Sequence, residues 1–376
     1  MPKSCYIHIP FCNNICSYCD FTKIYYKKGI VDEYLNSLEK EIENTYLDEE
    51  LDTIYIGGGT PSSLSLQELD KLFNILNKLK KSKNIEYTIE GNFESTTKEK
   101  LNLYKKYGIN RLSFGIESID KNNLKLLERN INKNKVIEII NYSKKIGLRN
   151  INVDLIYAIP GETIATLKKD IDFILNLDVS HISTYSLIIE DHTKLKINKI
   201  KNISEDLDFA MYKIICNKLS SNHYIHYEVS NFAKAGYSSK HNTCYWNNNE
   251  YYGFGLGASS YIGNVRSTNT KSINKYLNND YSKFIEYLTK KDKEEYEVIL
   301  NLRKREGINL QEFYNKYNTK LIDVYDYSSL VKDKLLILDE ESLHISEDKW
   351  YISNEIIVRL LGCEIKWILK SYLLLN

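Results

Sequence analysis

The chain alternates short apolar runs with longer segments of helical periodicity, and this alternation limits its possible folds more than any other feature. Each apolar run ends in glycine or a small polar residue, as buried parallel strands commonly do. Six of these runs are predicted strands, at residues 5–9, 53–56, 87–90, 111–114, 152–156 and 181–186. Strand-then-helix units in series form a parallel sheet with right-handed crossovers. The sequence therefore predicts an α/β fold whose sheet is closed or nearly closed into a barrel.

Apolar stripes at helical spacing fill the segments between these runs. The first stripe comprises Val31, Leu35, Leu38 and Ile42, and the second comprises Leu66, Leu69, Leu72, Leu76 and Leu79. Such stripes mark helices that bury one face, so both segments are predicted crossover helices. Barrels of this kind bind ligands at the carboxyl ends of their strands. Residues near those ends are therefore the first candidates for function.

The alternation fades after about residue 225, and helical spacing returns from about residue 290. Residues 236–266 are rich in Gly, Asn, Tyr and Ser and are predicted to form an extended, functional segment. Beyond residue 290, two helical stripes precede an alternating apolar run and a last helix, a pattern typical of a small winged-helix-like domain. We predict a barrel over 1–225, an extension over 226–289 and a small C-terminal domain over 290–376.

Positive and negative side chains are nearly balanced along the chain. Lys and Arg number 51 against 50 Asp and Glu, and neither sign forms a block longer than a helix face, so nucleic acid is not an expected partner. The longest apolar stretches, such as 356–361, fall short of the roughly 20 residues that a membrane span needs. These features predict a soluble, cytosolic protein without an integral membrane segment.

Three of the seven cysteines, Cys12, Cys16 and Cys19, lie within eight positions after the first predicted strand. A 4Fe-4S cluster ordinarily takes four thiolates, so three in one loop leave one iron without a protein ligand. In this pattern the open iron binds the amino and carboxylate groups of S-adenosylmethionine, whose sulfonium the reduced cluster can cleave to a carbon radical. The remaining cysteines are scattered, at Cys5, Cys216, Cys244 and Cys363. This is ligand spacing in a reducing compartment rather than a disulfide framework.

Two other interpretations of the cysteines remain open from the sequence. One is a zinc site completed by His8, and the other is three unrelated cysteines, although zinc loops favour paired C-x2-C knuckles. Cys5 is a further candidate ligand, but seven extended residues cover up to about 23 Å, which places it at the far end of the first strand. We therefore expect Cys5 to pack in the core.

A glycine-rich turn follows the second predicted strand, with the sequence Gly57, Gly58, Gly59, Thr60 and Pro61. Glycines bare the backbone, so its N–H and C=O groups can approach a ligand's ammonium group closely. Polar residues also mark the following strands, namely Glu90, Glu117 and Asp154, with Arg129 on the predicted helix after the fourth strand. Asp154 has apolar neighbours, and a buried carboxylate needs a partner.

These motifs resemble the anaerobic coproporphyrinogen-III oxidase family of the radical SAM superfamily. The resemblance runs through YIHIPFCNNICSYCDF, YIGGGTPSSLS, TIEGN, RLSFGIES, NVDLIYAIPGET, HISTYSLIIE, YEVSNFAKAGYSSKHNTCYW and YYGFGLGAS, in that order. It implies a partial (β/α)6 barrel. It also implies S-adenosylmethionine contacts from a set of aligned residues: Tyr6, Tyr18, Gly58, Gly59, Thr60, Glu90, Glu117, Arg129 and Asp154. Arg129 and Asp154 align with positions that hold a second S-adenosylmethionine in the oxidase.

Within this family the sequence is more similar to the haem-chaperone subfamily than to the oxidase. Asp20 and Phe21 follow the cysteine loop where the oxidase has Gly and a fourth Cys, and the oxidase's longer N-terminal extension does not precede it. The segment HNTCYW matches the chaperone's HNxxYW haem motif at four positions: His241, Asn242, Tyr245 and Trp246. The following GFGLGAS, residues 253–259, is predicted to form tight turns beneath that motif.

The motif's residue types suit haem. A neutral imidazole can ligate the iron, and Tyr and Trp offer flat apolar faces to a porphyrin; Cys244 is a second possible ligand. The leading hypothesis is a protein that binds one haem through His241 and transfers it to an acceptor protein. The alternative is an oxygen-independent coproporphyrinogen III oxidase that decarboxylates its substrate through a 5'-deoxyadenosyl radical. Radical methyl transfer, which uses the same barrel, is a third possibility, so the sequence leaves open whether the chain is an enzyme.

Overall fold

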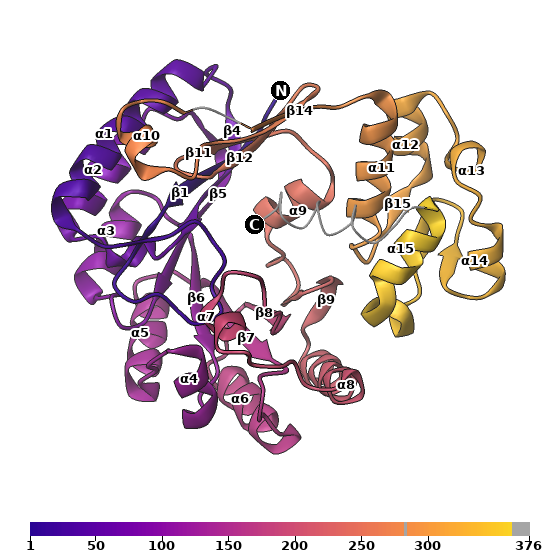
Figure 1. Ribbon diagram of the computed structural model, residues 1–376, viewed down its shortest axis with the longest axis horizontal. Coiled ribbons are helices and arrows are strands. Elements are labelled where there is room, and N and C mark those ends of the chain that lie inside the picture. The colour runs from indigo at the N-terminus through magenta and orange to yellow at the C-terminus, as the bar shows by residue number, and fades with distance from the viewer. Residues whose placement is uncertain (282–283, 363–376) are drawn as a thin grey trace.

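The computed structural model describes residues 1–281 and 284–362, and its centre is a twelve-stranded sheet in the order β14-β13-β12-β11-β1-β4-β5-β6-β7-β8-β10-β9. Six consecutive strands of this sheet are parallel, namely β1 (Ser4–Ile9), β4 (Leu51–Gly58), β5 (Lys81–Asn92), β6 (Arg111–Glu117), β7 (Asn150–Tyr157) and β8 (His181–Ser186). They contain the six predicted strands. The α/β prediction is confirmed, and the sheet curves around a central space without closing, because β14 and β9 are its two ends (Figure 1).

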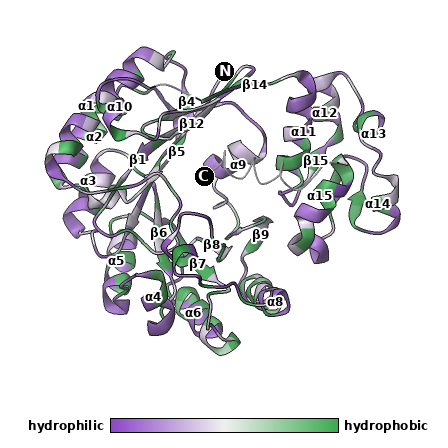
Figure 2. Ribbon diagram, viewed as in Figure 1, coloured by the Kyte–Doolittle hydropathy of each residue, from purple (hydrophilic) through white to green (hydrophobic). Residues whose placement is uncertain are grey.

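Helices cover the outside of the parallel strands (Figure 1). They are α1 (Lys28–Thr45), α2 (Leu66–Leu76), α3 (Lys98–Lys106), α4 (Lys121–Leu127), α5 (Lys133–Lys145), α6 (Ile164–Asn176) and α8 (Glu205–Ser221). The short helices η1 (Pro61–Ser63) and α7 (Lys194–Ile197) lie instead beside the loop after β1, because the Ser63 hydroxyl donates to the Phe11 carbonyl and the Leu195 N–H donates to the Ser17 carbonyl, both at 3.1 Å. The helices carry both hydrophilic and hydrophobic residues, as burial of one face requires (Figure 2). The stripe on α1 is buried as predicted. On α2, Leu66 is 42% exposed and Leu79 lies beyond the helix end, so that stripe is shorter than predicted.

The segment predicted to be extended is largely regular, so this prediction is wrong. Residues 236–266 contain a helix, α9 (Lys240–Trp246), the strands β11 (Tyr251–Phe254) and β12 (Ser259–Ile262), and the start of β13 (Val265–Thr268). Two short strands, β9 (Ile225–Glu228) and β10 (Asn231–Ala233), precede this segment, and α10 (Ile273–Leu277) and β14 (Phe284–Tyr287) follow it. Strand β11 pairs in parallel with β1, and β12 to β14 continue antiparallel from it. The chain therefore returns to the first strand and extends the same sheet.

The C-terminal part has a separate hydrophobic core, which includes Val298, Phe313, Leu343 and Ile357. Its helices are α11 (Lys290–Asn301), α12 (Leu310–Tyr317), α13 (Leu321–Val324), α14 (Ser328–Lys332), η2 (Glu347–Ile352) and α15 (Ser353–Leu361). Its antiparallel sheet has the order β15-β17-β16, with bounds β15 (Ile308–Asn309), β16 (Leu336–Leu338) and β17 (Ser342–Ile345). The predicted helices and alternating strands are present here.

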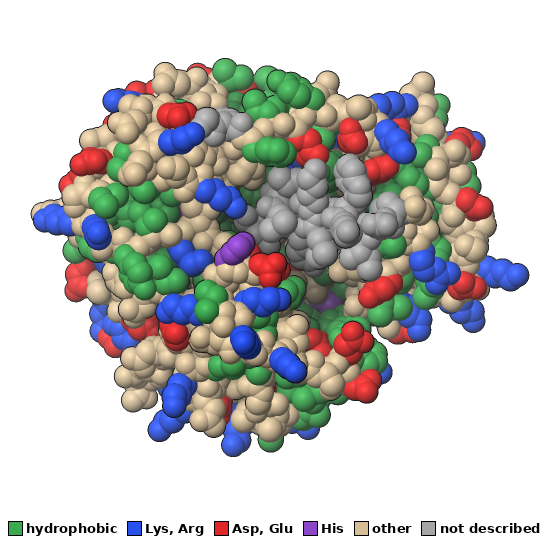
Figure 3. Space-filling model, viewed as in Figure 1, with side chains coloured by type: hydrophobic (Ala, Val, Ile, Leu, Met, Phe, Trp, Pro, Cys, Tyr) green, Lys and Arg blue, Asp and Glu red, His purple; other side chains and the backbone are tan. Residues whose placement is uncertain are grey.

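The face seen in Figure 3 carries charges of both signs without a large block of either. Among the described helices, none has the length and apolar content that a membrane crossing requires. Cys363 lies outside the described residues.

Candidate functional site

The inner face of the six parallel strands is lined by polar side chains. Every second residue points inward, giving the set Tyr6, His8, Thr53, Tyr55, Glu86, Thr88, Glu90, Arg111, Ser113, Asn152, Asp154, His181 and Ser183. Hydrogen bonds join these side chains between neighbouring strands, for example from Tyr55 on β4 to Glu90 on β5 at 2.6 Å and from Asn152 on β7 to Ser113 on β6 at 2.8 Å. The intervening apolar residues pack outward under the helices. The lumen is therefore a polar site rather than a packed core.

The cysteine loop lies at the carboxyl end of β1 and is closed by the short parallel strands β2 (Phe11–Cys12) and β3 (Ile24–Tyr25). Cys12 is 5% exposed, whereas Cys16 and Cys19 are partly exposed. Burial raises the pKa of all three thiols, that of Cys19 to about 11, and the charge of Cys16 raises the pKa of both other thiols. The three thiols are thus close enough to interact, and metal binding here would release their protons.

The donor set fits a cubane better than a single metal ion. Within 1–281 and 284–362, no three or more His, Cys, Asp or Glu side chains converge on one ion-sized position. A cubane takes each thiolate on a different iron, so its ligands stand further apart than those of one ion. His8 is engaged elsewhere, because its Nε2 contacts the Thr22 carbonyl at 2.7 Å and its Nδ1 contacts the Tyr6 hydroxyl at 3.0 Å. Cys5 is fully buried in the core, as predicted.

The glycine turn after β4 packs directly against the cysteine loop. Gly58 has a φ of +115°, and a Cβ added there would lie 2.7 Å from the His8 ring. A Cβ on Gly59 would lie 2.7 Å from the Pro10 backbone and 2.9 Å from the Cys12 Sγ. The Thr60 hydroxyl donates to that same Sγ at 3.5 Å. Only glycine allows this approach, so the turn and the loop form one site.

Glu90 joins the glycine turn to the lumen. Its carboxylate accepts hydrogen bonds from the Tyr55 hydroxyl at 2.6 Å and from the Gly58 N–H at 3.1 Å. Burial raises the pKa of Glu90 to about 7, against a smaller lowering from the Tyr55 hydrogen bond. The Tyr6 ring stacks on the Tyr55 ring with centroids 6.2 Å apart. Glu90 can therefore change charge near neutral pH when a cationic group binds beside it.

Glu117, Arg129 and Tyr18 form a buried polar triad. Arg129 donates to Glu117 from Nε at 3.1 Å and from Nη2 at 3.0 Å, and the Tyr18 hydroxyl donates to Glu117 at 3.2 Å. Arg129 also approaches the Cys16 Sγ at 4.0 Å. It lies just beyond the end of α4 rather than on that helix, because Glu128 ends the helix in the left-handed conformation. The triad therefore carries a fixed charge pair next to the cysteine loop.

Asp154 lies one strand further, partly buried on the lumen face of β7. Asn152 donates to its Oδ1 at 2.8 Å, so the expected partner of this carboxylate is a neighbouring amide. Burial raises the pKa of Asp154. The predicted S-adenosylmethionine residues therefore fall into two contact groups, one around Glu90 and the glycine turn and one around Glu117 and Arg129, with Asp154 on the inward face of β7.

The haem motif lies at the other end of this lumen, on α9. The Glu86 carboxylate accepts from the backbone N–H groups of His241 and Lys240, both at 3.0 Å, and so holds the start of the helix. His241 is 1% exposed, and its ring stacks on Tyr55 with centroids 5.1 Å apart. Thr53, whose hydroxyl contacts the His241 ring, lies in the amino half of β4, whereas the cysteines follow the carboxyl end of β1. The structure does not bring the two motifs together.

Both ring nitrogens of His241 are hydrogen-bonded. Nδ1 contacts the Thr53 hydroxyl at 2.7 Å, and Nε2 contacts the Tyr245 hydroxyl at 2.8 Å. Burial lowers the pKa of His241 to about 3, with a further lowering from the charge of Arg111. Asn242, Tyr245 and Trp246 are each partly exposed. The imidazole is therefore neutral, as an iron ligand must be, but neither nitrogen is free in this arrangement.

The glycines after the motif form a tight turn, as predicted, but not beneath α9. Gly255 and Gly257 have φ angles of +108° and +71°. Their added Cβ atoms would lie 2.6 Å from the His8 carbonyl and 2.5 Å from the Thr22 hydroxyl, respectively. The turn therefore supports the cysteine loop at the opposite end of the barrel.

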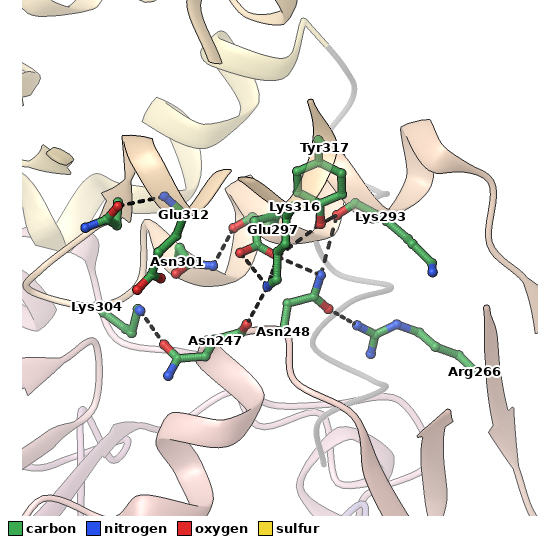
Figure 4. Close-up of polar contacts among 11 residues, drawn as sticks. Asn247, Asn248, Arg266, Lys293, Glu297, Asn301, Lys304, Glu312, Lys316 and Tyr317 are labelled. Atoms are coloured by element: carbon green, nitrogen blue, oxygen red, sulfur yellow. Dashed lines mark hydrogen bonds and ion pairs between the residues drawn. The ribbon is translucent and has the colours of Figure 1, made fainter. Parts of the chain in front are cut away.

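A polar network joins the end of α9 to the C-terminal helices (Figure 4). The buried Glu297 on α11 accepts from Lys316 at 2.9 Å, from Tyr317 at 3.1 Å and from Asn248 at 3.2 Å. Asn248, two residues beyond α9, also accepts from Arg266 at 2.7 Å. No sequence motif predicts this network, because its members lie far apart along the chain.

A three-cysteine loop at the carboxyl end of a curved parallel sheet defines a radical SAM protein. Residues 6–174 match the radical SAM superfamily, and residues 288–351 match the HemN C-terminal domain. The chain is 38% identical to the heme chaperone HemW of Bacillus subtilis, over 96% of this chain and 98% of that one, and 38% identical to that of Lactococcus lactis, over 96% and 97%. The chain belongs to the HemW family.

A solved structure supports the fold. The coproporphyrinogen III oxidase HemN of Escherichia coli superposes with a TM-score of 0.84 at 21% identity, over 95% of this chain and 89% of that one. At that identity the likeness shows the fold alone. Membership of the radical SAM superfamily implies a 4Fe-4S cluster and S-adenosylmethionine as cofactors, as predicted.

Proposed function

We propose that this chain is a haem chaperone, which binds one haem and transfers it to an acceptor protein. The observation that carries the proposal is its 38% identity, over nearly the whole length of both chains, to proteins named heme chaperone HemW. The absence of a fourth cysteine at Asp20 and Phe21 agrees with that subfamily. No recognisable motif in the sequence identifies the acceptor protein.

In this proposal Cys12, Cys16 and Cys19 hold the 4Fe-4S cluster at the open end of the lumen. Bound there, the cluster and S-adenosylmethionine can supply an electron and a carbon radical. Glu90 and the glycine turn are placed to orient the cofactor's cationic groups, since Glu90 ionises near neutral pH and the turn bares its backbone. The Glu117–Arg129 pair provides a fixed charge beside Cys16.

We propose that His241 ligates the haem iron and that Asn242, Tyr245 and Trp246 contact the porphyrin. Ligation through Nε2 requires the Tyr245 hydroxyl to leave that nitrogen, and ligation through Nδ1 requires the Thr53 hydroxyl to leave. Because the ring is 1% exposed, α9 must also shift from the end of the lumen. Haem binding is then coupled to an opening of α9.

We also propose that the chain works in the cytosol. Six cysteines of the described part are free thiols, and three of them have the spacing of cluster ligands, which suits a reducing compartment. A cluster with an open iron needs such surroundings because its thiolates are readily oxidised.

Haem titration of the anaerobically reconstituted chain tests the proposal. We expect one haem per chain, with binding weakened strongly in His241→Ala and unchanged in His192→Ala, an exposed control. Equal haem binding by His241→Ala and the wild type would reject His241 as the ligand. An assay with coproporphyrinogen III separates the two functions: protoporphyrinogen formed at a useful rate would refute the chaperone proposal, and S-adenosylhomocysteine would indicate methyl transfer.

A further inference from the structure

Arg111 is a buried cation for which the described residues provide no hydrogen-bond or ion-pair partner. It begins β6 on the inward face, is 2% exposed and is among the largest fully buried side chains. Its Nε is buried without a hydrogen-bond partner, and no described residue forms a hydrogen bond or an ion pair with the guanidinium. Thr88, which faces it across the β5–β6 register, also has a buried hydroxyl without a partner.

The groups around Arg111 do not compensate its charge closely. Burial raises the pKa of Glu90 and of Asp154, and the charge of Arg111 only partly opposes that rise. His181 and His241 face the same space, and burial followed by the charge of Arg111 keeps the pKa of each low and both rings neutral. A buried guanidinium that lacks a close counter-charge has lost its hydration without an equivalent replacement. Such a group is a site for an anion.

The position of Arg111 identifies the kind of anion. Arg111 pairs with Thr88 on β5. On the same face of that strand, Glu86 accepts from the His241 N–H in the predicted haem motif, and Glu90 accepts from the Gly58 N–H in the predicted cofactor site. Arg111 therefore lies between the two. A guanidinium fork matches the planar, two-oxygen geometry of a carboxylate. Haem carries two propionate carboxylates, and S-adenosylmethionine carries one. Both ligands of the proposed function therefore present the chemistry that would pair with this group.

We propose that Arg111, assisted by the Thr88 hydroxyl, binds a carboxylate of a ligand that enters the lumen. Naming haem or S-adenosylmethionine as its source rests on the proposed function. Ligand binding would replace the missing counter-charge, so the cost that Arg111 imposes on the ligand-free protein is recovered in the complex.

The first test is the stability of the ligand-free chain. Arg111→Gln removes a buried charge without breaking an ion pair, so thermal unfolding should occur at the wild-type temperature or above it. Arg359→Gln, which makes the same charge change at an exposed ion pair, is the control. A strong decrease in melting temperature for Arg111→Gln, or failure to fold, would show that the guanidinium is a structural element and would overturn the proposal.

The second test compares ligands with and without free carboxylates. Haem, haem dimethyl ester and S-adenosylmethionine are titrated into wild type, Arg111→Gln, Arg111→Lys and Arg359→Gln. Loss of a charged hydrogen bond should weaken binding roughly ten- to hundredfold. If Arg111 holds a propionate, Arg111→Gln weakens haem but not the ester; if it holds the cofactor carboxylate, only S-adenosylmethionine is weakened. Arg111→Lys should weaken the same ligand less.

The outcomes separate this site from the proposed function. Affinities of Arg111→Gln equal to wild type for haem and S-adenosylmethionine would overturn the carboxylate site while leaving the chaperone proposal intact. A wild type that binds no haem refutes the chaperone proposal, and the S-adenosylmethionine titration alone then decides the role of Arg111. Equal weakening of haem and its ester would also overturn the site, since the ester lacks the charge.

Discussion

The two ends of the lumen differ in how completely their polar groups are satisfied. At the carboxyl end, Cys16 and Cys19 are partly exposed, and burial raises the pKa of Glu90 to about 7. At the other end, His241 is 1% exposed and both its nitrogens are hydrogen-bonded. The predicted cofactor end therefore presents partly exposed thiols, whereas the predicted haem end is closed by its own side chains. Haem affinity must therefore include the cost of opening α9.

Replacing Cys12, Cys16 and Cys19 together by Ser should have the largest effect on the cofactor end. Serine does not provide the thiolates that iron–sulfur clusters require, so the reconstituted variant should lose nearly all its iron and its visible absorbance. Cys216→Ser is the control, since Cys216 lies on α8 away from the loop. A triple variant that retains wild-type iron content would show that the loop is not the cluster site.

Arg129→Gln should destabilise the ligand-free protein by about 3 kcal/mol, because it leaves Glu117 buried without its counter-charge. Urea unfolding measures this free energy. Arg359→Gln breaks an exposed pair with Asp333 and should cost at most about 1 kcal/mol. Equal effects of the two variants would mean that the buried pair contributes no more than a surface pair.

Glu90→Gln should remove part of the pH dependence of stability. The folded-state pKa of Glu90, about 7, lies above its ordinary value of 4.5, so the folded protein holds this proton more tightly. The stabilisation that this proton gives to the folded state is complete below the pKa of Glu90 in the unfolded chain, and it is lost as pH rises through 7. Between pH 5 and 8 the wild type should lose about 2 kcal/mol more than Glu90→Gln. Glu33→Gln, at an exposed site, should behave as wild type, and identical profiles for all three would contradict the shift.

Tyr245→Phe, at the predicted haem end, should have the smallest effect of these substitutions, and it should strengthen haem binding instead of causing a loss. It keeps the flat ring but removes the hydroxyl from His241 Nε2, so haem should bind roughly two- to tenfold more tightly. Tyr314→Phe, 42% exposed on α12, is the control. Weaker haem binding by Tyr245→Phe would show that the hydroxyl contributes to the bound state instead of closing the free one.

The sequence predicted the parallel strands and the cluster loop because both depend on local patterns. Apolar runs and cysteine spacing are visible within a few residues of sequence. The six predicted strands and the burial of Cys5 in the core are confirmed. The strands β11 to β14 were missed because β11 pairs with β1 across more than 240 residues. No local pattern specifies such a partner. The predicted domain boundaries remain predictions.

A local sequence pattern also indicates the polar inner face of the sheet. Alternate positions in the strand segments TIYI, EYTIE and RLSF are polar, which marks an inward polar face, yet only the charged strand-end residues were singled out. Thr53, Glu86 and Arg111 would have followed from that alternation. The closure around His241 could not, because it depends on where α9 meets β4.

An electron paramagnetic resonance spectrum of the reduced, reconstituted chain, recorded with and without S-adenosylmethionine, tests the account most directly. Three thiolates that leave one iron open predict a cluster signal that shifts when the cofactor is added. A signal that does not change, in a sample with a full complement of iron and sulfide, would contradict the assignment of Cys12, Cys16 and Cys19.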